Sequence, residues 1–265
     1  VQAPWYRMCR LCMPSPSLFA AILLSYCQDL IPQCLRPYVN WQLRIRPVCG
    51  EACQGRSGYV TYARTGIARP PDPEADQTVP GSTSPDATRI HLDPVGGLAG
   101  DMFIAAMLDA WPERETAMVG AIQAAGLPTG IALELLPHTD HALSGRRFVV
   151  TNGAPIDAHS TTPWRTIRER LSAADMPAAT AARATDIFAR LAAAEASVHG
   201  VAIDDVTFHE VGAWDSIADI VGAAFLIDTC GAVRWTAAAL PLGAGRVASA
   251  HGDLPVPAPA TAALL

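Results

Sequence analysis

A stretch rich in proline, aspartate, serine and threonine, residues 69–89, divides the 265-residue chain into two parts of different character. Such a stretch buries too little apolar surface to pack on itself, so we predict a disordered linker there. The linker confines the predicted core to residues 90–265. Residues 1–68 are predicted to be a poorly structured leader that is not a native domain.

Charge and metal-binding residue types divide at the same place. Residues 1–89 have a net charge of +3 and residues 90–265 a net charge of −9, and all seven histidines lie in the second part. The acidic part has no basic stripe to neutralise phosphates, which disfavours nucleic acid and is compatible with cations. The chain contains no lysine, which excludes Schiff-base chemistry on a lysine side chain and the lysine of a P-loop. Six of the seven cysteines lie in the first part: Cys9, Cys12, Cys27, Cys34, Cys49 and Cys53.

The leader carries no convincing targeting signal or metal motif. Its longest apolar run, Leu18–Leu24, is too short to span a bilayer. The bulky Tyr26 stands where the cleavage site of a signal peptide needs a small residue. The pairs Cys9/Cys12 and Cys49/Cys53 leave a four-thiolate zinc site open, although the long gap and unequal spacings disfavour it.

The part from residue 90 onward is typical of a mixed α/β (α+β) fold, in which helices pack on a small sheet. Proline and glycine mark the ends of most segments. We expect strands at 88–93, 131–136, 147–151, 206–210 and 233–240, with a long polar turn at 138–145, and helices at 101–110, 113–125, 163–176, 178–198 and from 215 onward.

A glycine-rich turn separates the first predicted strand from the first predicted helix. Gly96, Gly97 and Gly100 would let the backbone approach a phosphate at the start of that helix. Asp93 and Asp101 flank the turn, and their carboxylates suit a metal or a metal–nucleotide better than a free anion. A tight turn capped by Asp101 is the structural alternative.

Two further groups of residues combine carboxylates with imidazoles. Glu195 and His199 are four residues apart on one helix, so they share a face and could clamp one cation; the alternative is a helix-end contact. His209 and Glu210 end a predicted strand, and Asp215 begins the next helix. Asp219 lies one turn beyond Asp215, so these four residues are expected to converge where a strand ends and a helix starts, a common place for sites in open sheets. The alternative there is one buried ion pair and a helix cap.

Several long motifs resemble LarC, the nickel-insertion protein of nickel-pincer cofactor biosynthesis. They are IHLDPVGGLAG (90–100), AEASVHG (194–200), FHEVGAWDSIADIVGAA (208–224) and LPLGAGRVASAHGDLPVPAPA (240–260). The resemblance covers residues 90–265. It implies a cytoplasmic nickel chelatase (a cyclometallase, classed as a lyase) that inserts nickel into pyridinium-3,5-bisthiocarboxylic acid mononucleotide, consuming CTP with Mg or Mn. The finished cofactor serves lactate racemase and related enzymes.

The chain departs from the family pattern in two respects. It corresponds to the N-terminal half of the family, so we expect it to be truncated, with the CTP site in a half that could be encoded separately. A histidine-rich run common in relatives is reduced to His159. Imidazole and carboxylate ligands suit nickel that must be handed on. The candidates are His209 and Glu210 as catalytic bases, Gly96, Gly97 and Gly100 for the substrate phosphate, and Asp93, Asp101, Glu195, His199, His209 and Asp215 as metal ligands.

Other functions remain open at this stage. One alternative is a non-catalytic metal-binding or assembly module, or a gene remnant that lacks the CTP-binding half. Another is a metal-dependent hydrolase on an α/β scaffold. An exposed edge left by truncation would favour a homo-oligomer. Neither nucleic acid nor a membrane is expected as a partner.

Overall fold

The computed structural model describes most of residues 88–265 and one segment further upstream. The described ranges are 43–48, 88–94, 98–140, 143–152, 161–208, 214–231, 233–240, 242–249 and 252–265. Most of the predicted leader and linker lies outside these ranges, as do the six leader cysteines. The predictions for those regions, including the zinc hypothesis, therefore stay predictions.

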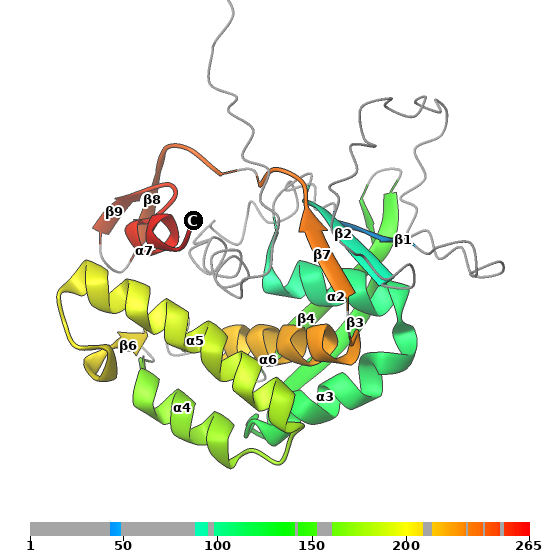
Figure 1. The fold of residues 1–265 in the computed structure, drawn as a ribbon, viewed down its shortest axis with the longest axis horizontal. Coiled ribbons are helices and arrows are strands. Elements are labelled where there is room, and N and C mark those ends of the chain that lie inside the picture. Colours follow the sequence, from blue (N-terminus) through cyan, green and yellow to red (C-terminus); the bar gives the residue numbers. More distant parts are fainter. Residues whose placement is uncertain are drawn as a thin grey trace, which may run out of the picture.

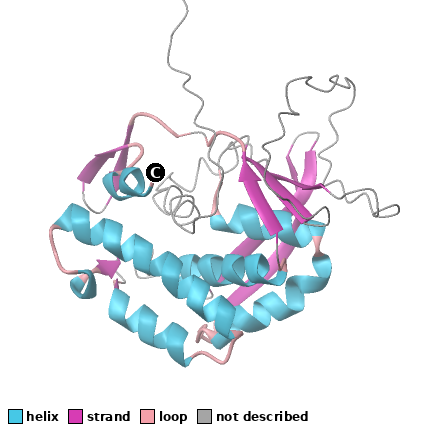
Figure 2. Ribbon diagram, in the orientation of Figure 1, coloured by secondary structure: helices cyan, strands magenta, loops and turns pink. Residues whose placement is uncertain are grey.

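Helices dominate the described part of the chain (Figures 1 and 2), and the mixed α/β class is confirmed. The helix predicted at 113–125 begins as a 3₁₀ turn, Pro112–Arg114, because proline has no N–H and suits a first helical turn. None of the helices in the described ranges is long and apolar enough to cross a bilayer. The helices are α2 (Gly100–Ala110), α3 (Glu115–Ala124), α4 (Trp164–Ala173), α5 (Ala178–His199), α6 (Trp214–Thr229) and α7 (Pro259–Leu264).

A three-stranded sheet has the strand order β1-β2-β7. β2 (Thr88–Pro94) lies between β1 (Leu43–Val48), to which it is antiparallel, and β7 (Val233–Ala237), to which it is parallel. The sequence analysis did not predict β1. The backbone N–H of Ala238 donates to the Leu92 carbonyl at 2.8 Å, so the β2–β7 pairing continues just past the end of β7.

Three two-stranded pairs complete the strands of the described ranges. The largest is a hairpin of β3 (Ile131–Asp140) and β4 (Leu143–Asn152). The predicted long polar turn at 138–145 is wrong, because strand pairing continues to Asp140 and Leu143. Backbone ladder bonds do not require apolar side chains, so polar residues extend the strands into solvent. The short pairs are β5 (Thr162–Pro163) with β6 (Thr207–Phe208), and β8 (Arg246–Ser249) with β9 (Gly252–Pro255).

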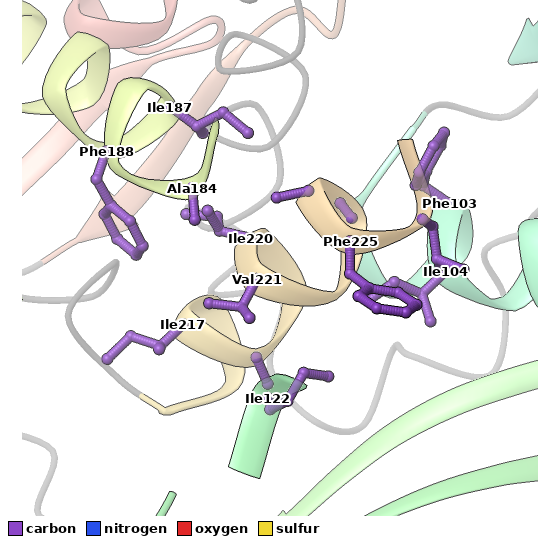
Figure 3. Packing of buried hydrophobic residues seen from close by; sticks show 14 of the residues in the cluster. Phe103, Ile104, Ile122, Ala184, Ile187, Phe188, Ile217, Ile220, Val221 and Phe225 are labelled. Carbon is purple, nitrogen blue, oxygen red and sulfur yellow. The ribbon is translucent and has the colours of Figure 1, made fainter. Parts of the chain in front are cut away.

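Helix α6 lies at the centre of the hydrophobic core (Figure 3). It packs against α2 and α3 on one side and against α5 on another, and its residues from Ser216 to Leu226, except Asp219, are buried. On α5, Phe188 lies between Trp164 and Phe208, with ring centroids 6.4 and 6.2 Å away. An ion pair between Arg183 Nε and Asp228 Oδ1, 2.5 Å apart, joins α5 to the end of α6.

Gly222 allows α6 to approach α2 and α3 closely. A Cβ atom at this position would lie 2.8 Å from Ile104 Cδ1, 3.2 Å from Ile122 Cδ1 and 3.4 Å from Met118 Sδ. All three neighbouring side chains are fully buried. Because the surrounding core is closely packed, these neighbours have little room to move. The short distance from α6 to α2 and α3 thus depends on glycine having no side chain at position 222.

We predict that Gly222→Val lowers the free energy of unfolding by about 1–3 kcal/mol, the usual cost of overpacking a core. Gly120 on α3 is the matched control, because a Cβ atom there meets nothing within 4 Å. Gly120→Val is expected to leave stability within about 0.5 kcal/mol of the wild type, since valine is the better helix former. Chemical denaturation checks both values. Equal stabilities of the two variants would contradict this view of the helix contact.

Candidate functional site

Helix α2 begins shortly after the carboxyl end of β2. Asp93 is the last residue but one of β2. Gly100, which is buried, is the first residue of α2. The N-cap residue Ala99 has no side chain that can accept a hydrogen bond. Instead, Asp101 Oδ1 accepts the backbone N–H of Met102 at 2.8 Å. The start of α2 is therefore capped by an acidic side chain rather than by its N-cap residue.

Helix α6 begins with a similar acidic cap. Asp215 Oδ1 accepts the backbone N–H of Ser216 at 2.7 Å. The preceding residue, Trp214, lies under the guanidinium of Arg170, which is 4.6 Å from the ring centroid. This cation–π contact ties the start of α6 to α4. Both helices thus present an aspartate in the first turn, where a negative charge is favoured by the helix dipole.

Asp219 connects the two helix starts. It lies one turn after Asp215 on α6, and its carboxylate accepts a hydrogen bond from the backbone N–H of Asp101 on α2. A side chain of one helix therefore caps the other. Its second oxygen, Oδ1, is buried and has no hydrogen-bond partner in the structure. We call Asp101, Asp215 and Asp219 the acidic junction.

The pKa of Asp219 is raised well above its ordinary value. Burial is the largest cause, because the charged form loses its hydration. Repulsion from Asp101 and then from Asp215 adds to the effect, and the hydrogen bond from the Asp101 backbone partly opposes it. Asp219 consequently favours a bound proton or a nearby positive charge.

The charge balance of the junction favours a cation over an anion. Each helix start contributes about +0.5 of an elementary charge, which is less than the negative charge that the carboxylates of Asp101 and Asp215 carry when ionised, even with Asp219 protonated. The amides that would bind a phosphate are also in use: Asp101 N–H by Asp219, Met102 N–H by Asp101, and Ser216 N–H by Asp215. Within the described ranges, no three His, Cys, Asp or Glu side chains are grouped to hold a metal by themselves. A cation here would need further ligands.

Several of the predicted site residues lie outside the described residues. His209 and Glu210, the predicted bases, precede α6 in the undescribed segment 209–213, and Gly96 and Gly97 lie in 95–97. Both segments adjoin the acidic junction in sequence, since 95–97 leads into α2 and 209–213 into α6. Their contribution stays a prediction.

Glu195 and His199 form a separate pair near the end of α5. His199 Nε2 lies 3.4 Å from Glu195 Oε2, as their spacing of four residues predicts. Gly200 ends the helix in a left-handed conformation, with φ of 66°. In Figure 1, α5 ends near α7, well beyond the point where α6 begins. The structure therefore does not bring this pair together with the acidic junction.

Asp219 is the residue that the sequence analysis underrated. Its spacing predicts a place one turn from Asp215, but the predicted metal ligands do not include it. The sequence does contain a signal for this residue: an acidic side chain stands between the apolar residues Ala218 and Ile220, in a helix whose neighbouring residues are buried. An acidic residue on such a helix needs a partner, and that partner came from α2, more than 100 positions earlier in the sequence.

Comparisons with known proteins point to one family. A family model described as "Nickel insertion protein" matches residues 90–265. Relatives from Myxococcus xanthus, Thermomicrobium roseum and Pelobacter propionicus, each named "Putative nickel insertion protein", are 43%, 41% and 42% identical over 180, 178 and 183 residues. Each alignment covers 66% of this chain but only 45%, 42% and 44% of the relative. The chain thus spans less than half the length of these relatives. No solved structure matches it.

We predict that the free energy of unfolding of the metal-free chain decreases as the pH rises, because of Asp219. The pKa of Asp219 is higher in the folded state, so the folded chain holds the proton more tightly than the unfolded chain. The loss of stability therefore grows as the pH rises above about 4, the pKa of an aspartate in the unfolded chain. Asp219→Asn keeps an acceptor for the Asp101 N–H and has no charge. The variant should therefore gain stability relative to the wild type between pH 4 and 8 in chelator-treated buffer. A stability difference between wild type and Asp219→Asn that stays constant across this pH range would contradict the raised pKa of Asp219.

Proposed function

The chain belongs to the nickel insertion protein family, and on this premise we propose that it acts in the insertion of Ni²⁺ into pyridinium-3,5-bisthiocarboxylic acid mononucleotide. The observation that carries the proposal is the family match over residues 90–265, which contains the whole acidic junction. The product would be the nickel-pincer cofactor of lactate racemase-type enzymes. We place this activity in the cytoplasm, and we expect CTP with Mg²⁺ or Mn²⁺ to be required by the longer proteins of the family.

Nickel is the cargo in this reaction. Carboxylates and imidazoles bind Ni²⁺ without the strong affinity of thiolates, so the ion can be transferred. We propose Asp101 and Asp215 at the acidic junction as ligands, completed by His209 from the segment that leads into α6. Asp93, at the carboxyl end of β2, is a further candidate ligand. The separate pair Glu195 and His199 would serve as an outer binding point, because it lies on another part of the structure.

The insertion also requires a base. One nickel–carbon bond forms at a ring carbon as its C–H bond breaks, and two nickel–sulfur bonds form to the thiocarboxylates. The electron pair of the C–H bond stays on carbon and binds nickel, while the proton leaves to a base. His209 or Glu210 would take that proton, since both residue types act as general bases near neutral pH. Gly96, Gly97 and Gly100 would bring the backbone near the substrate phosphate.

A non-catalytic assembly module is the second candidate function. The observation in its favour is the acidic junction, whose carboxylates favour a cation. In this case the chain would hold nickel and leave its insertion into the organic substrate to another protein. Binding without turnover distinguishes this function from the first.

We predict that the chain, supplemented with the part of the Myxococcus xanthus relative that it does not span and given Ni²⁺, the mononucleotide, CTP and Mn²⁺, forms the nickel-bound product, which mass spectrometry detects. The longer Myxococcus xanthus relative is assayed beside it. Nickel bound without product would support the assembly module. No nickel binding at all would contradict both functions.

His209→Ala is expected to slow product formation by about 100-fold, a usual contribution of a general base, with little change in folding. Asp175→Asn is the control, because Asp175 is exposed between α4 and α5. It should retain full activity. Undiminished product formation by His209→Ala would remove this residue from the proposed mechanism, and the same measurement on Glu210→Gln would then decide the role of Glu210.

A further inference from the structure

Strand β1 reaches the sheet from outside the region that matches the family. It spans Leu43–Val48, whereas the family match covers residues 90–265, and residues 49–87 join it to β2 along the chain. Even so, every residue of β1 has a partner in β2 (Figure 1). In the described sheet, β1 covers the edge of β2 that faces away from β7.

The sequence of β1, LRIRPV, begins with apolar residues that alternate with arginine. Ile45 stands opposite Leu92, which is buried in the core. Arg44 stands opposite Asp93, and opposite charges at such positions stabilise a strand pair. A register shifted by one residue would move the arginines to the core face, where an unpaired charge is costly. The pairing is therefore specific to this pattern of residues.

The backbone of β1 donates hydrogen bonds to β2 at alternate residues only. Because proline has no N–H, Pro47 occupies a position whose nitrogen points away from β2, and the N–H of Arg46 then points toward β2, opposite His91. The other side of β2 has the same phase. The Leu92 carbonyl accepts the N–H of Ala238, just past β7, so the residues next to Leu92 face β1. The outer edge of β1 lacks one donor at its proline, which disfavours a further strand there.

We infer that the edge of β2 is a binding site for an extended peptide in which apolar residues alternate with arginine, and that β1 fills this site as a detachable strand. Ladder hydrogen bonds would supply the affinity, and the alternation of side chains would supply the selectivity. A short edge strand on a long connection opens at a lower free energy than the packed core does. A protein that offers a segment of this pattern would therefore bind the sheet by replacing β1. The inference does not depend on nickel insertion, since it rests on strand pairing alone.

The test adds a fluorescent peptide of residues 43–48 to the full chain and measures binding by fluorescence anisotropy. Arg46→Pro in the chain removes the N–H that points toward β2 and should detach β1. This variant should bind the peptide at least tenfold more tightly than the wild type, whose edge is occupied. Arg46→Gln is the matched control, because it removes the same charge but keeps the N–H, and it should bind like the wild type.

The peptide has its own control, since a peptide that carries Arg46→Pro should not bind the Arg46→Pro chain. Equal binding of the two peptides by this chain would overturn the inference. Equal binding of the unmodified peptide by the wild-type and Arg46→Pro chains would overturn it as well.

Hydrogen exchange of the wild type keeps the test decisive if Arg46→Pro does not fold. The amides of His91 and Asp93 face β1, and the amide of Leu92 faces β7. Detachment of β1 should let the first two amides exchange at least tenfold faster than that of Leu92. Excess peptide should slow the exchange of His91 and Asp93 and leave Leu92 unchanged. Equal exchange of all three amides, or exchange that the peptide does not slow, would overturn the inference.

Discussion

The packing of α6 against α2, α3 and α5 is the constraint on which the rest of the structure depends. Full burial of a large apolar side chain contributes about 1.5–3 kcal/mol, and α6 buries Ile217, Ile220, Val221 and Leu226 at once. An unsatisfied buried polar atom costs about 1–3 kcal/mol. The apolar contacts therefore exceed the cost of placing Asp219 in the same helix. The core therefore tolerates this acidic side chain, and it holds the side chain against the start of α2.

This arrangement makes the position of the acidic junction a property of the core rather than of a loop. Asp101 belongs to a helix with a buried face, and Asp215 and Asp219 belong to the helix at its centre. The separation of the two helix starts is set by close contacts such as the one at Gly222. Sites built on packed helices keep their geometry more closely than sites on loops. In the sequence, the segments 95–97 and 209–213, which contain Gly96, Gly97, His209 and Glu210, lead directly into α2 and α6.

Periodicity along the chain was enough to predict the helices and the pairing of Glu195 with His199, because both depend on residues close in sequence. It was not enough to predict β1 or the full length of the β3–β4 hairpin. Those depend on backbone pairing between segments whose side chains give little signal. The contact of Asp219 with Asp101 could not be predicted either, because it joins two helices far apart in the sequence. Spacing placed Asp219 on a face with Asp215, whereas only the tertiary structure shows which helix start that face meets.

The parallel pairing of β2 with β7 has a consequence for the order in which the chain folds. The hydrogen bond between His91 and Thr236, at 2.9 Å, joins residues 145 positions apart. Closing so long a loop costs entropy that nearby contacts do not, so such pairings form late. We expect α2, α3, α5 and α6 to associate first and to bring the two strands together. During synthesis, the edge of β2 that faces β7 then stays unpaired until nearly the whole of this region has left the ribosome, and during that interval it is open to pairing with other chains.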